Sequence, residues 1–442
     1  MHRPPFAALT ALAALLLTLP GLAGAQSLKD LYEAARGYDA TYLSARALAD
    51  SAQYKAEQVD ALGRPRVGLA ASSYRSRVYL PQNYGSGDQS SSSANVNGRY
   101  PIYNQSNKAA IEQGGKSLAM AQADLEAAEQ DLIVRVAQAY FDVLASRDAL
   151  ETTRASKAAI TEQLASAKRN FEVGTATITD TREAQARYDL ARAQEIQAEN
   201  DLRTKRIALQ SLVGKADVEP RPLAQPVTLP AIAPADPESW VTTADGVHPS
   251  IRKARLAYEV AQLETEKARA GGKPTLDAVA SAGVSNSSGT GVLTSIPGST
   301  KTATVGLEFN WPLYAGGSIQ NRIKETLSLE DKARNDLQGA LRAVEQGTRV
   351  AYFDLQSGMA QVQALEAAES SSKLALEATQ LGYKVGVRVN IDVLNSQTQL
   401  YTTERDLAKA RYDVIVGGLK LRRAAGALGQ GDVEAANRLL AK

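Results

Sequence analysis

The chain has 442 residues, of which 44% are hydrophobic, 22% charged and 5% aromatic, and its formal net charge is +2. This balance provides no broad field for nucleic acid or an anionic membrane surface, so we predict no nucleic-acid partner. Cysteine is absent, which excludes disulfides and thiol chemistry, and His248 is the only histidine beyond the leader, so we predict no metal and no other cofactor.

Residues 1–25 have the pattern of a secretory signal peptide. Arg3 provides the positive charge, residues 6–19 form a short apolar stretch, and Ala23-Gly24-Ala25 fits the small-residue cleavage rule. After this leader no run of 18 apolar residues occurs, so the sequence predicts no transmembrane helix. An exported chain of this kind can enter a membrane only through β-strands.

The first predicted unit covers residues 26–219. In chain order the sequence predicts a helix over 28–62, strands near 67–80 and 92–103, a very long helix over 105–170 and a last helix over 181–213. The strands make a hairpin, residues 67–103. Residues 81–93 between them are rich in Gly, Ser and Asn, and are predicted to form an exposed loop.

The second predicted unit, residues 238–428, follows a linker over residues 220–237 that holds six of the 16 prolines. It repeats the order of the first unit, with a helix over 238–270, strands near 275–285 and 302–313, a long helix over 318–381 and a last helix over 391–428. The strands make the hairpin 275–313, and a C-terminal segment, residues 429–442, follows the unit.

Short motifs recur at a nearly constant distance. Ala139-Tyr-Phe-Asp142 returns 212 residues later as Ala351-Tyr-Phe-Asp354. The pair Val173-Gly174 returns at the same offset as Val385-Gly386. The sequence therefore predicts one supersecondary unit used twice.

The Val-Gly pairs separate the last two predicted helices of each unit. Glycine can adopt the positive φ that closes one helix, and Thr179 or Asn390 is then predicted to cap the next helix. An acidic residue follows in the first turn, Asp180 or Asp392. Two ordinary helix connections and two moving parts of a gate both fit this pattern.

The predicted strands alternate in polarity. Val305, Leu307 and Phe309 alternate with Gly306, Glu308 and Asn310, and a span of ten to twelve residues suits a tilted strand crossing a bilayer. Tyr100, Tyr103, Trp311 and Tyr314 are predicted to lie at the periplasmic ends of the strands as an aromatic girdle. A hairpin packed on a soluble core is the alternative.

Two hairpins give four strands, too few to close a membrane barrel, whereas three chains give twelve. A helix of about 65 residues is about 100 Å long, far beyond an ordinary globular helix. Two adjacent seven-residue stripes run along residues 391–428, one from Val393 through Leu400 and one from Leu394 through Tyr401. They predict packing on two sides and a left-handed supercoil, as in a ring of helices.

Together these features resemble the TolC family of outer-membrane efflux proteins, the exit ducts of drug-efflux pumps and type I secretion systems. The resemblance covers nearly all of the chain after the leader and includes the segment Trp311-Pro-Leu-Tyr-Ala-Gly-Gly317. It implies a mainly α fold with transmembrane β: a homotrimer whose 12-stranded β-barrel continues into a periplasmic α-helical coiled-coil barrel. The Pro-rich linker and the C-terminal segment would form an equatorial belt.

The resemblance also implies a periplasmic gate at the Val-Gly turns. The family's tyrosine and arginine fall on Tyr383 and Arg388, and their partners fall on Thr179 and Asp180. Arginine can bind a carboxylate and a hydroxyl together, so these bonds are expected to hold the closed state. The acidic ring at the narrowest point is expected at Asp392, where multivalent cations would block the pore. The family's second acid is Asn395 in this chain, so the second ring carries no charge.

The sequence contains no motif for a nucleophile, a phosphate loop or a metal-dependent hydrolase, so we predict that the chain is not an enzyme. The resemblance implies a passive, gated exit duct in the outer membrane, in contact with outer-membrane lipid and extending into the periplasm. Its implied partners are a periplasmic adaptor (membrane fusion) protein and an inner-membrane transporter, either an ABC or a proton-driven one. The alternative is a structural or adhesive periplasmic coiled-coil protein without a pore.

Overall fold

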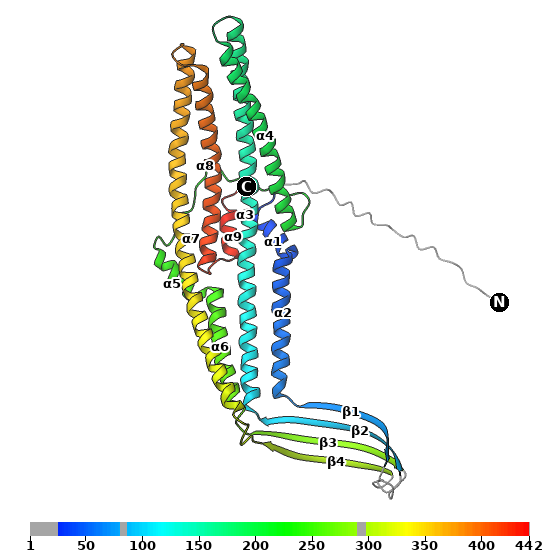
Figure 1. Cartoon of the computed structure of the whole chain (residues 1–442). Coiled ribbons are helices and arrows are strands. Elements are labelled where there is room, and N and C mark those ends of the chain that lie inside the picture. The colour runs from blue at the N-terminus through cyan, green and yellow to red at the C-terminus, as the bar shows by residue number, and fades with distance from the viewer. Residues whose placement is uncertain (1–24, 80–85, 290–297, 442) are drawn as a thin grey trace, which may run out of the picture.

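A computed structural model describes residues 25–79, 86–289 and 298–441. It shows a long assembly of helices with a four-stranded antiparallel sheet at one end (Figure 1). The predicted signal peptide lies outside the described residues, except for Ala25.

The two halves of the chain repeat one order of elements. The first half contains α1 (Leu28–Tyr38), α2 (Ala40–Asp60), a short 3-10 turn η1 (Ala61–Gly63), β1 (Arg66–Tyr79), β2 (Ser86–Tyr103), α3 (Gln105–Glu172) and α4 (Ile178–Val213). The second contains α5 (Pro237–Val247), α6 (Pro249–Ala270), β3 (Thr275–Gly289), β4 (Gly298–Asn310), α7 (Ser318–Lys384) and α8 (Asn390–Ala424), and α9 (Gln430–Asn437) follows it.

The first helical segment of each half is broken, so the predictions of continuous helices over 28–62 and 238–270 were wrong. In the first half Asp39 takes an extended conformation, and its carboxylate caps α2 by accepting a hydrogen bond from the Tyr42 N–H at 2.8 Å. In the second half the break is His248-Pro249, because proline can begin a helix but cannot continue one. Nδ1 of His248 accepts a hydrogen bond from the Ser250 N–H at 3.1 Å.

The sheet has the strand order β1-β2-β3-β4, and every neighbouring pair is antiparallel. β2 begins at Ser86, so most of the predicted loop over residues 81–93 is strand. Hydroxyl groups pair across β1 and β2 there, with Ser73 Oγ and Ser92 Oγ 2.8 Å apart. β4 ends at Asn310, before the expected end at residue 313, since Pro312 has no N–H to continue the ladder.

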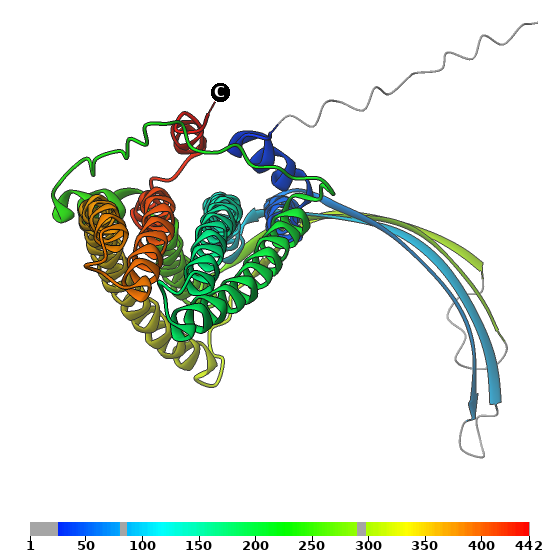
Figure 2. The ribbon, with the colours of Figure 1, turned by 90° about the horizontal axis from the view of Figure 1, so that it is seen from above.

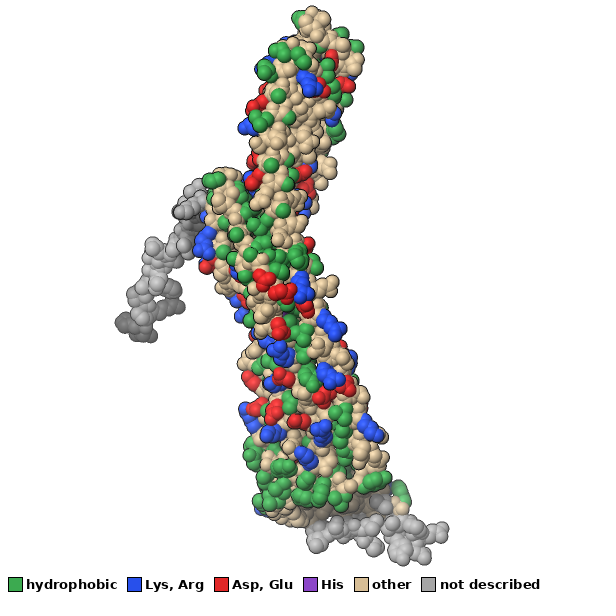
Figure 3. Space-filling model, turned by 90° about the vertical axis from the view of Figure 1, so that its left-hand side faces the viewer, with side chains coloured by type: hydrophobic (Ala, Val, Ile, Leu, Met, Phe, Trp, Pro, Cys, Tyr) green, Lys and Arg blue, Asp and Glu red, His purple; other side chains and the backbone are tan. Residues whose placement is uncertain are grey.

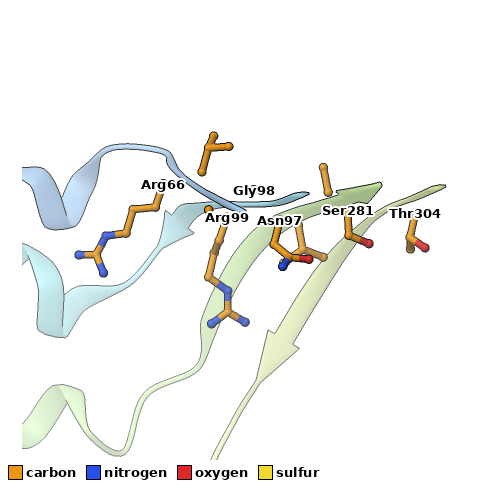
Figure 4. Close-up of a pocket in the computed structure, with 10 residues that line it drawn as sticks. Arg66, Asn97, Gly98, Arg99, Ser281 and Thr304 are labelled. Atoms are coloured by element: carbon orange, nitrogen blue, oxygen red, sulfur yellow. The ribbon is translucent and has the colours of Figure 1, made fainter. Parts of the chain in front are cut away.

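The register places side chains of different character on the two faces of the sheet. Cross-strand partners share a face, so the rows Leu69–Val96–Ala282–Ala303 and Tyr100–Ala278–Leu307 make one face apolar. The opposite face carries the row Gly68–Asn97–Ser281–Thr304 and, beside it, Arg66 and Arg99. Figure 4 shows the labelled polar side chains on the same side of the strands. Arg99 is ion-paired with Glu308 on this polar face.

The long helix α3 lies in the middle of the helical layer. It packs against α2 and α6 toward the sheet and against α4 and α8 toward the other end, whereas α7 packs against α5, α6 and α8 at the edge. Viewed along the helices, α1, α9 and the linker after α4 lie together on one side of the layer (Figure 2). Because these three segments share that side, we call it the outer side.

The main core lies at this level, halfway along the helices. It joins apolar side chains of α1, α3, α4, α8 and α9 with Val218 and Leu223 of the linker region. Tyr140 of α3 is fully buried there, and its hydroxyl donates to the carbonyl oxygens of Gln26 and Arg221 at 3.1 and 3.0 Å. The start, middle and end of the described chain therefore meet at one place.

The surface changes in character toward the sheet. On the face seen in Figure 3, hydrophobic side chains gather at the sheet end of the helices, and charged side chains of both signs lie further along. Among the residues that the structure describes, no helix combines the length and the apolar character needed to cross a membrane.

Candidate functional site

The two Val-Gly turns form the tip of the molecule, at the end opposite the sheet (Figure 1). Gly174 and Gly386 have φ values of 78° and 79°, a backbone conformation that residues with a Cβ rarely adopt. After each glycine an N–H returns to the preceding helix, from Thr175 to the Asn170 carbonyl and from Val387 to the Gly382 carbonyl, both at 2.8 Å. Both long helices therefore end in the same way.

The caps of the following helices differ from the predicted ones. Thr177, and not Thr179, caps α4, in a capping box with Asp180: the Asp180 N–H donates to the Thr177 hydroxyl at 3.2 Å, and the Thr177 N–H donates to the Asp180 carboxylate at 3.0 Å. The N-cap of α8 is Val389, without a side-chain bond, and Asn390 is the first helical residue. Thr179 is exposed in the first turn of α4.

Asn390 ties the second turn to the first half of the chain. Its side chain is only 2% exposed and accepts a hydrogen bond from Gln163 of α3. Its amide nitrogen also donates to the Asp180 carbonyl at 3.4 Å. A buried amide bonded on both sides fixes the start of α8 against α3 and α4.

Among the residues that the structure describes, neither Tyr383 nor Arg388 forms a hydrogen bond or an ion pair with Thr179 or Asp180. The Tyr383 hydroxyl accepts a hydrogen bond from the Asn170 amide at 3.2 Å. Arg388 lies one turn before Asp392, and their charged groups are 3.6 Å apart. The expected pairing is therefore absent among the described residues of one chain, because Asp180 is bonded to Thr177 and Arg388 is paired with Asp392, four residues further along the chain.

Asn395 also faces the first half of the chain. Its side-chain oxygen accepts a hydrogen bond from Arg187 of α4 at 2.8 Å. Beside it Leu394 is completely buried among Leu164, Ala167 and Ala184. Leu394 begins the second predicted stripe of α8, and Val393, Leu400, Leu407, Val414 and Leu421 of the first stripe are all buried.

We call the contacts Gln163–Asn390, Asn170–Tyr383 and Arg187–Asn395 the tip bonds. They join the α3–α4 pair to the α7–α8 pair, and sequence reasoning did not identify Gln163, Asn170 or Arg187. These residues are polar and lie on polar helices, where no periodic pattern distinguishes a bonded side chain from a solvated one. Only the offset of 213 residues between Asn170 and Tyr383, close to that of the repeats, points to one of the contacts.

The four predicted girdle residues lie where the strands meet the helices. Tyr100 and Tyr103 belong to the last four residues of β2. Trp311 and Tyr314 lie in the four residues after the end of β4. All four side chains are exposed. The indole N–H of Trp311 donates to the Gly272 carbonyl at 3.2 Å, which fixes this ring beside the end of α6.

Comparison with known proteins identifies the family. Residues 31–215 and 240–427 match the family model of the outer membrane efflux protein. The chain belongs to this family. The two matched stretches correspond to the two halves of the fold, and the family is one of transport proteins, not of enzymes. Membership assigns the chain to the outer membrane, as a channel for efflux or secretion.

Relatives support this membership over nearly the whole chain. The outer membrane protein TolC of Vibrio cholerae is 31% identical over 94% of both chains, and TolC of Escherichia coli is 30% identical over 95% of this chain and 86% of its own. The alkaline protease secretion protein AprF of Pseudomonas aeruginosa is 34% identical over 69% of this chain and 63% of its own.

Solved structures have the same fold. The outer membrane protein VceC from Vibrio cholerae superimposes with a TM-score of 0.76 at 22% identity, covering 91% of this chain and 96% of its own. A membrane protein from Pseudomonas aeruginosa gives a TM-score of 0.79 at 21% identity, covering 90% and 93%.

Proposed function

We propose that three copies of this chain form a passive, gated export duct across the outer membrane and the periplasm. The observation that carries the proposal is that both edge strands of the described sheet lack a partner strand on one side. Among the described strands, β1 pairs only with β2 and β4 only with β3, so one edge of each is open. The apolar face of the sheet is suited to a lipid bilayer, and in a bilayer the backbone groups of an open strand edge cannot remain without hydrogen-bond partners.

The internal repeat predicts how copies join. Within the chain β2 of the first half pairs with β3 of the second, so the equivalent pairing is β4 with β1 of the next copy. Likewise α3 packs on α8 within the chain, and the equivalent contact is α7 with α4 of the next copy. Exposed apolar side chains occupy both of these helices, with Phe353 on α7 and Ile207 on α4. Three copies give a closed barrel of twelve strands and a ring of helices.

The tip is the proposed gate. The tip bonds hold each α7–α8 pair against the α3–α4 pair of its own chain. The predicted lock of Arg388 and Tyr383 with Thr179 and Asp180 would then form between copies, since it is absent within one. In this arrangement three copies of Asp392 surround the axis and favour cations over anions.

The proposed duct has no energy source of its own. AprF and the proteases secretion protein PrtF of Dickeya chrysanthemi are named as secretion proteins, and SrpC of Pseudomonas putida as the outer membrane protein of a solvent efflux pump. By analogy, the proposed partners are a periplasmic adaptor and an inner-membrane ABC or proton-driven transporter.

The test combines location, assembly and conduction. The full-length protein should fractionate with the outer membrane, give three chains per particle in native mass spectrometry and conduct ions in planar bilayers. Asp392→Ala should reduce cation selectivity and block by trivalent metal ions added from the periplasmic side, with the trimer intact. A structural or adhesive coiled-coil protein would give no current. A conducting trimer that keeps its cation selectivity and its block in Asp392→Ala would support the duct but show that Asp392 does not line the pore.

A further inference from the structure

A hollow lies at the junction between the helices and the sheet, between the start of α3 and the end of α6. It is lined by charged side chains of both signs over a buried Ala109 floor: Lys108, Glu112, Glu266, Arg269, Lys273, with Gln105 at its sheet end. We call it the junction hollow. It belongs neither to the tip nor to the polar face of the sheet.

The junction hollow lies on the outer side of the helical layer. Lys108 is three heptads from Glu129 along α3, and Glu129 contacts α1 on the outer side: the Tyr32 hydroxyl donates to it at 3.0 Å, and Arg36 is 3.5 Å away. A straight helix drifts by about 20° per heptad, which is about 60° over three heptads, so both residues stay on one side of α3. The proposed pore lies on the other side.

Most of the charges in this hollow are available to a ligand. Lys108, Arg269, Glu112 and Glu266 are exposed, and none has an ion-pair partner within the described residues. Neighbouring charges on the same helices are paired, for example Lys116 with Glu259 at 2.6 Å. Lys273 donates a hydrogen bond to Gln105 at 2.7 Å, which fixes its ammonium group at the sheet end.

Aromatic residues place this hollow at the boundary of the proposed membrane segment. The Tyr103 hydroxyl donates to the same Gln105 side chain at 3.3 Å, and Trp311 is bonded to Gly272, next to Lys273. Tyrosine and tryptophan occupy the headgroup level of membranes, with the apolar part of the ring toward the hydrocarbon. The junction hollow is therefore level with lipid headgroups, beside the apolar face of the sheet.

We propose that the junction hollow binds the phosphoethanolamine headgroup of a phospholipid. The inference rests on the proposed membrane insertion of the sheet. Lys108, Arg269 and Lys273 supply cations for the phosphate, and the first turn of α3 adds the positive end of a long helix. Glu112 and Glu266 supply carboxylates for the ammonium group. A purely anionic headgroup would leave these two acids without a partner and close to its phosphate.

The test is lipid binding by the full-length trimer in native mass spectrometry, after delipidation in non-ionic detergent. Phosphatidylethanolamine, phosphatidylglycerol and phosphatidylcholine with identical acyl chains are titrated separately. Phosphatidylethanolamine should bind several-fold more tightly than the other two lipids. The quaternary ammonium of phosphatidylcholine cannot donate hydrogen bonds to the carboxylates, and phosphatidylglycerol has no ammonium group.

Three variants separate the two parts of the site. Lys108→Gln with Arg269→Gln should weaken binding of both phosphatidylethanolamine and phosphatidylglycerol roughly tenfold, because charge-assisted contacts to phosphate are lost. Glu112→Gln with Glu266→Gln should remove only the preference for phosphatidylethanolamine. Lys55→Gln is the matched control, since Lys55 is exposed in a separate hollow beside α2 and should bind lipid as the parent does.

Equal binding of phosphatidylcholine and phosphatidylethanolamine by the parent would overturn the proposal. Parent-like binding by the cation variant, or an equal loss in Lys55→Gln, would also overturn it. A trimer that conducts ions but shows one of these results rejects the headgroup site and leaves the export duct standing. A chain that neither inserts nor conducts rejects the duct itself.

Discussion

The two halves of the chain place equivalent side chains in different surroundings. Phe141 of α3 is 1% exposed, and its ring lies 5.8 Å from that of Tyr412 on α8. The equivalent Phe353 of α7 is 53% exposed. Both follow a tyrosine whose hydroxyl donates to a backbone carbonyl, so the local structure is the same. The difference teaches that this level of α3 is covered by its own chain, whereas the same level of α7 is open in the single chain, as the proposed contact with a next copy requires.

The largest expected effect separates these two phenylalanines. Phe141→Ala should lower the free energy of unfolding by about 3–5 kcal/mol, because it leaves a cavity in the main core. Phe353→Ala should change the folding of the individual chain much less and lower the fraction of trimer. Chemical denaturation and native mass spectrometry measure the two quantities on each variant.

The control for this pair is Val247→Ala, at the last residue of α5, which is 45% exposed. It should change neither quantity. A trimer that remains intact in Phe353→Ala and also in Phe353→Glu would contradict the proposed contact of α7 with the next copy.

The two helix breaks extend the comparison to ionisable groups. Arg135 donates two hydrogen bonds of 2.9 Å to the Asp39 carboxylate, and these bonds hold the pKa of Asp39 below its usual range. Asp39→Asn keeps a capping side chain but removes the charge, and should cost about 1–3 kcal/mol. Because the folded state favours the ionised form, this stability is present above the ordinary pKa near 3.8 and is lost as the pH falls through the folded-state value. The stabilities of parent and variant, measured by denaturation between pH 6 and pH 3, should therefore differ by a constant amount above pH 3.8 and draw closer below it.

A smaller effect is expected from the tip bonds. Arg187→Ala removes the bond to Asn395 and Tyr383→Phe removes the hydroxyl that accepts from Asn170, so two of the three tip bonds are lost, each worth on the order of 1 kcal/mol. The α7–α8 pair should then separate more easily from α3–α4, and single-channel conductance should rise in an intact trimer. Lys409→Ala, a solvated position further along α8, is the control. Unchanged conductance in the double variant would make the tip turns simple connectors.

The smallest effect belongs to the second helix break. Burial and the nearby Arg423 cation lower the pKa of His248. Protonation of Nδ1 would also break its hydrogen bond with the Ser250 N–H. Stability from this cap is therefore present above the ordinary pKa near 6.5 and decreases below it, by less than about 1 kcal/mol. Thermal unfolding between pH 7.5 and pH 5 should show this slope in the parent and lose it in His248→Asn. Equal slopes would show that the imidazole does not cap α6.

The sequence predicted the repeated order of elements because hydrophobic periodicity and duplicated motifs report directly on helices and strands. It also placed the long helix 105–170 within two residues of α3. The sequence prediction failed where the local backbone conformation depends on bonds to residues far away in the sequence. The break at Asp39 depends on Arg135, which is far away in the sequence, and the strand at Ser86–Ser93 depends on hydroxyl partners in β1.

The candidate site was predicted less completely than the fold. The positive φ of Gly174 and Gly386 follows from residue type and spacing. The partners of Arg388 and Asn390 do not, because they depend on how two helix pairs turn toward each other. A resemblance supplied pairs of residues, and the single chain shows that other partners hold those residues within it.

The meeting point at the main core constrains the order in which the chain can fold. Lys29 of α1 and Glu434 of α9 form an ion pair although 405 residues separate them in the sequence, and the Ala441 N–H donates to the Pro222 carbonyl at 2.8 Å. Contacts of such high sequence separation form late, since a very long loop must close first. The helices can assemble with their sequence neighbours first, whereas the midsection can close only once residues 430–441 are available to it. Completion of this midsection therefore depends on residues from both ends of the described chain.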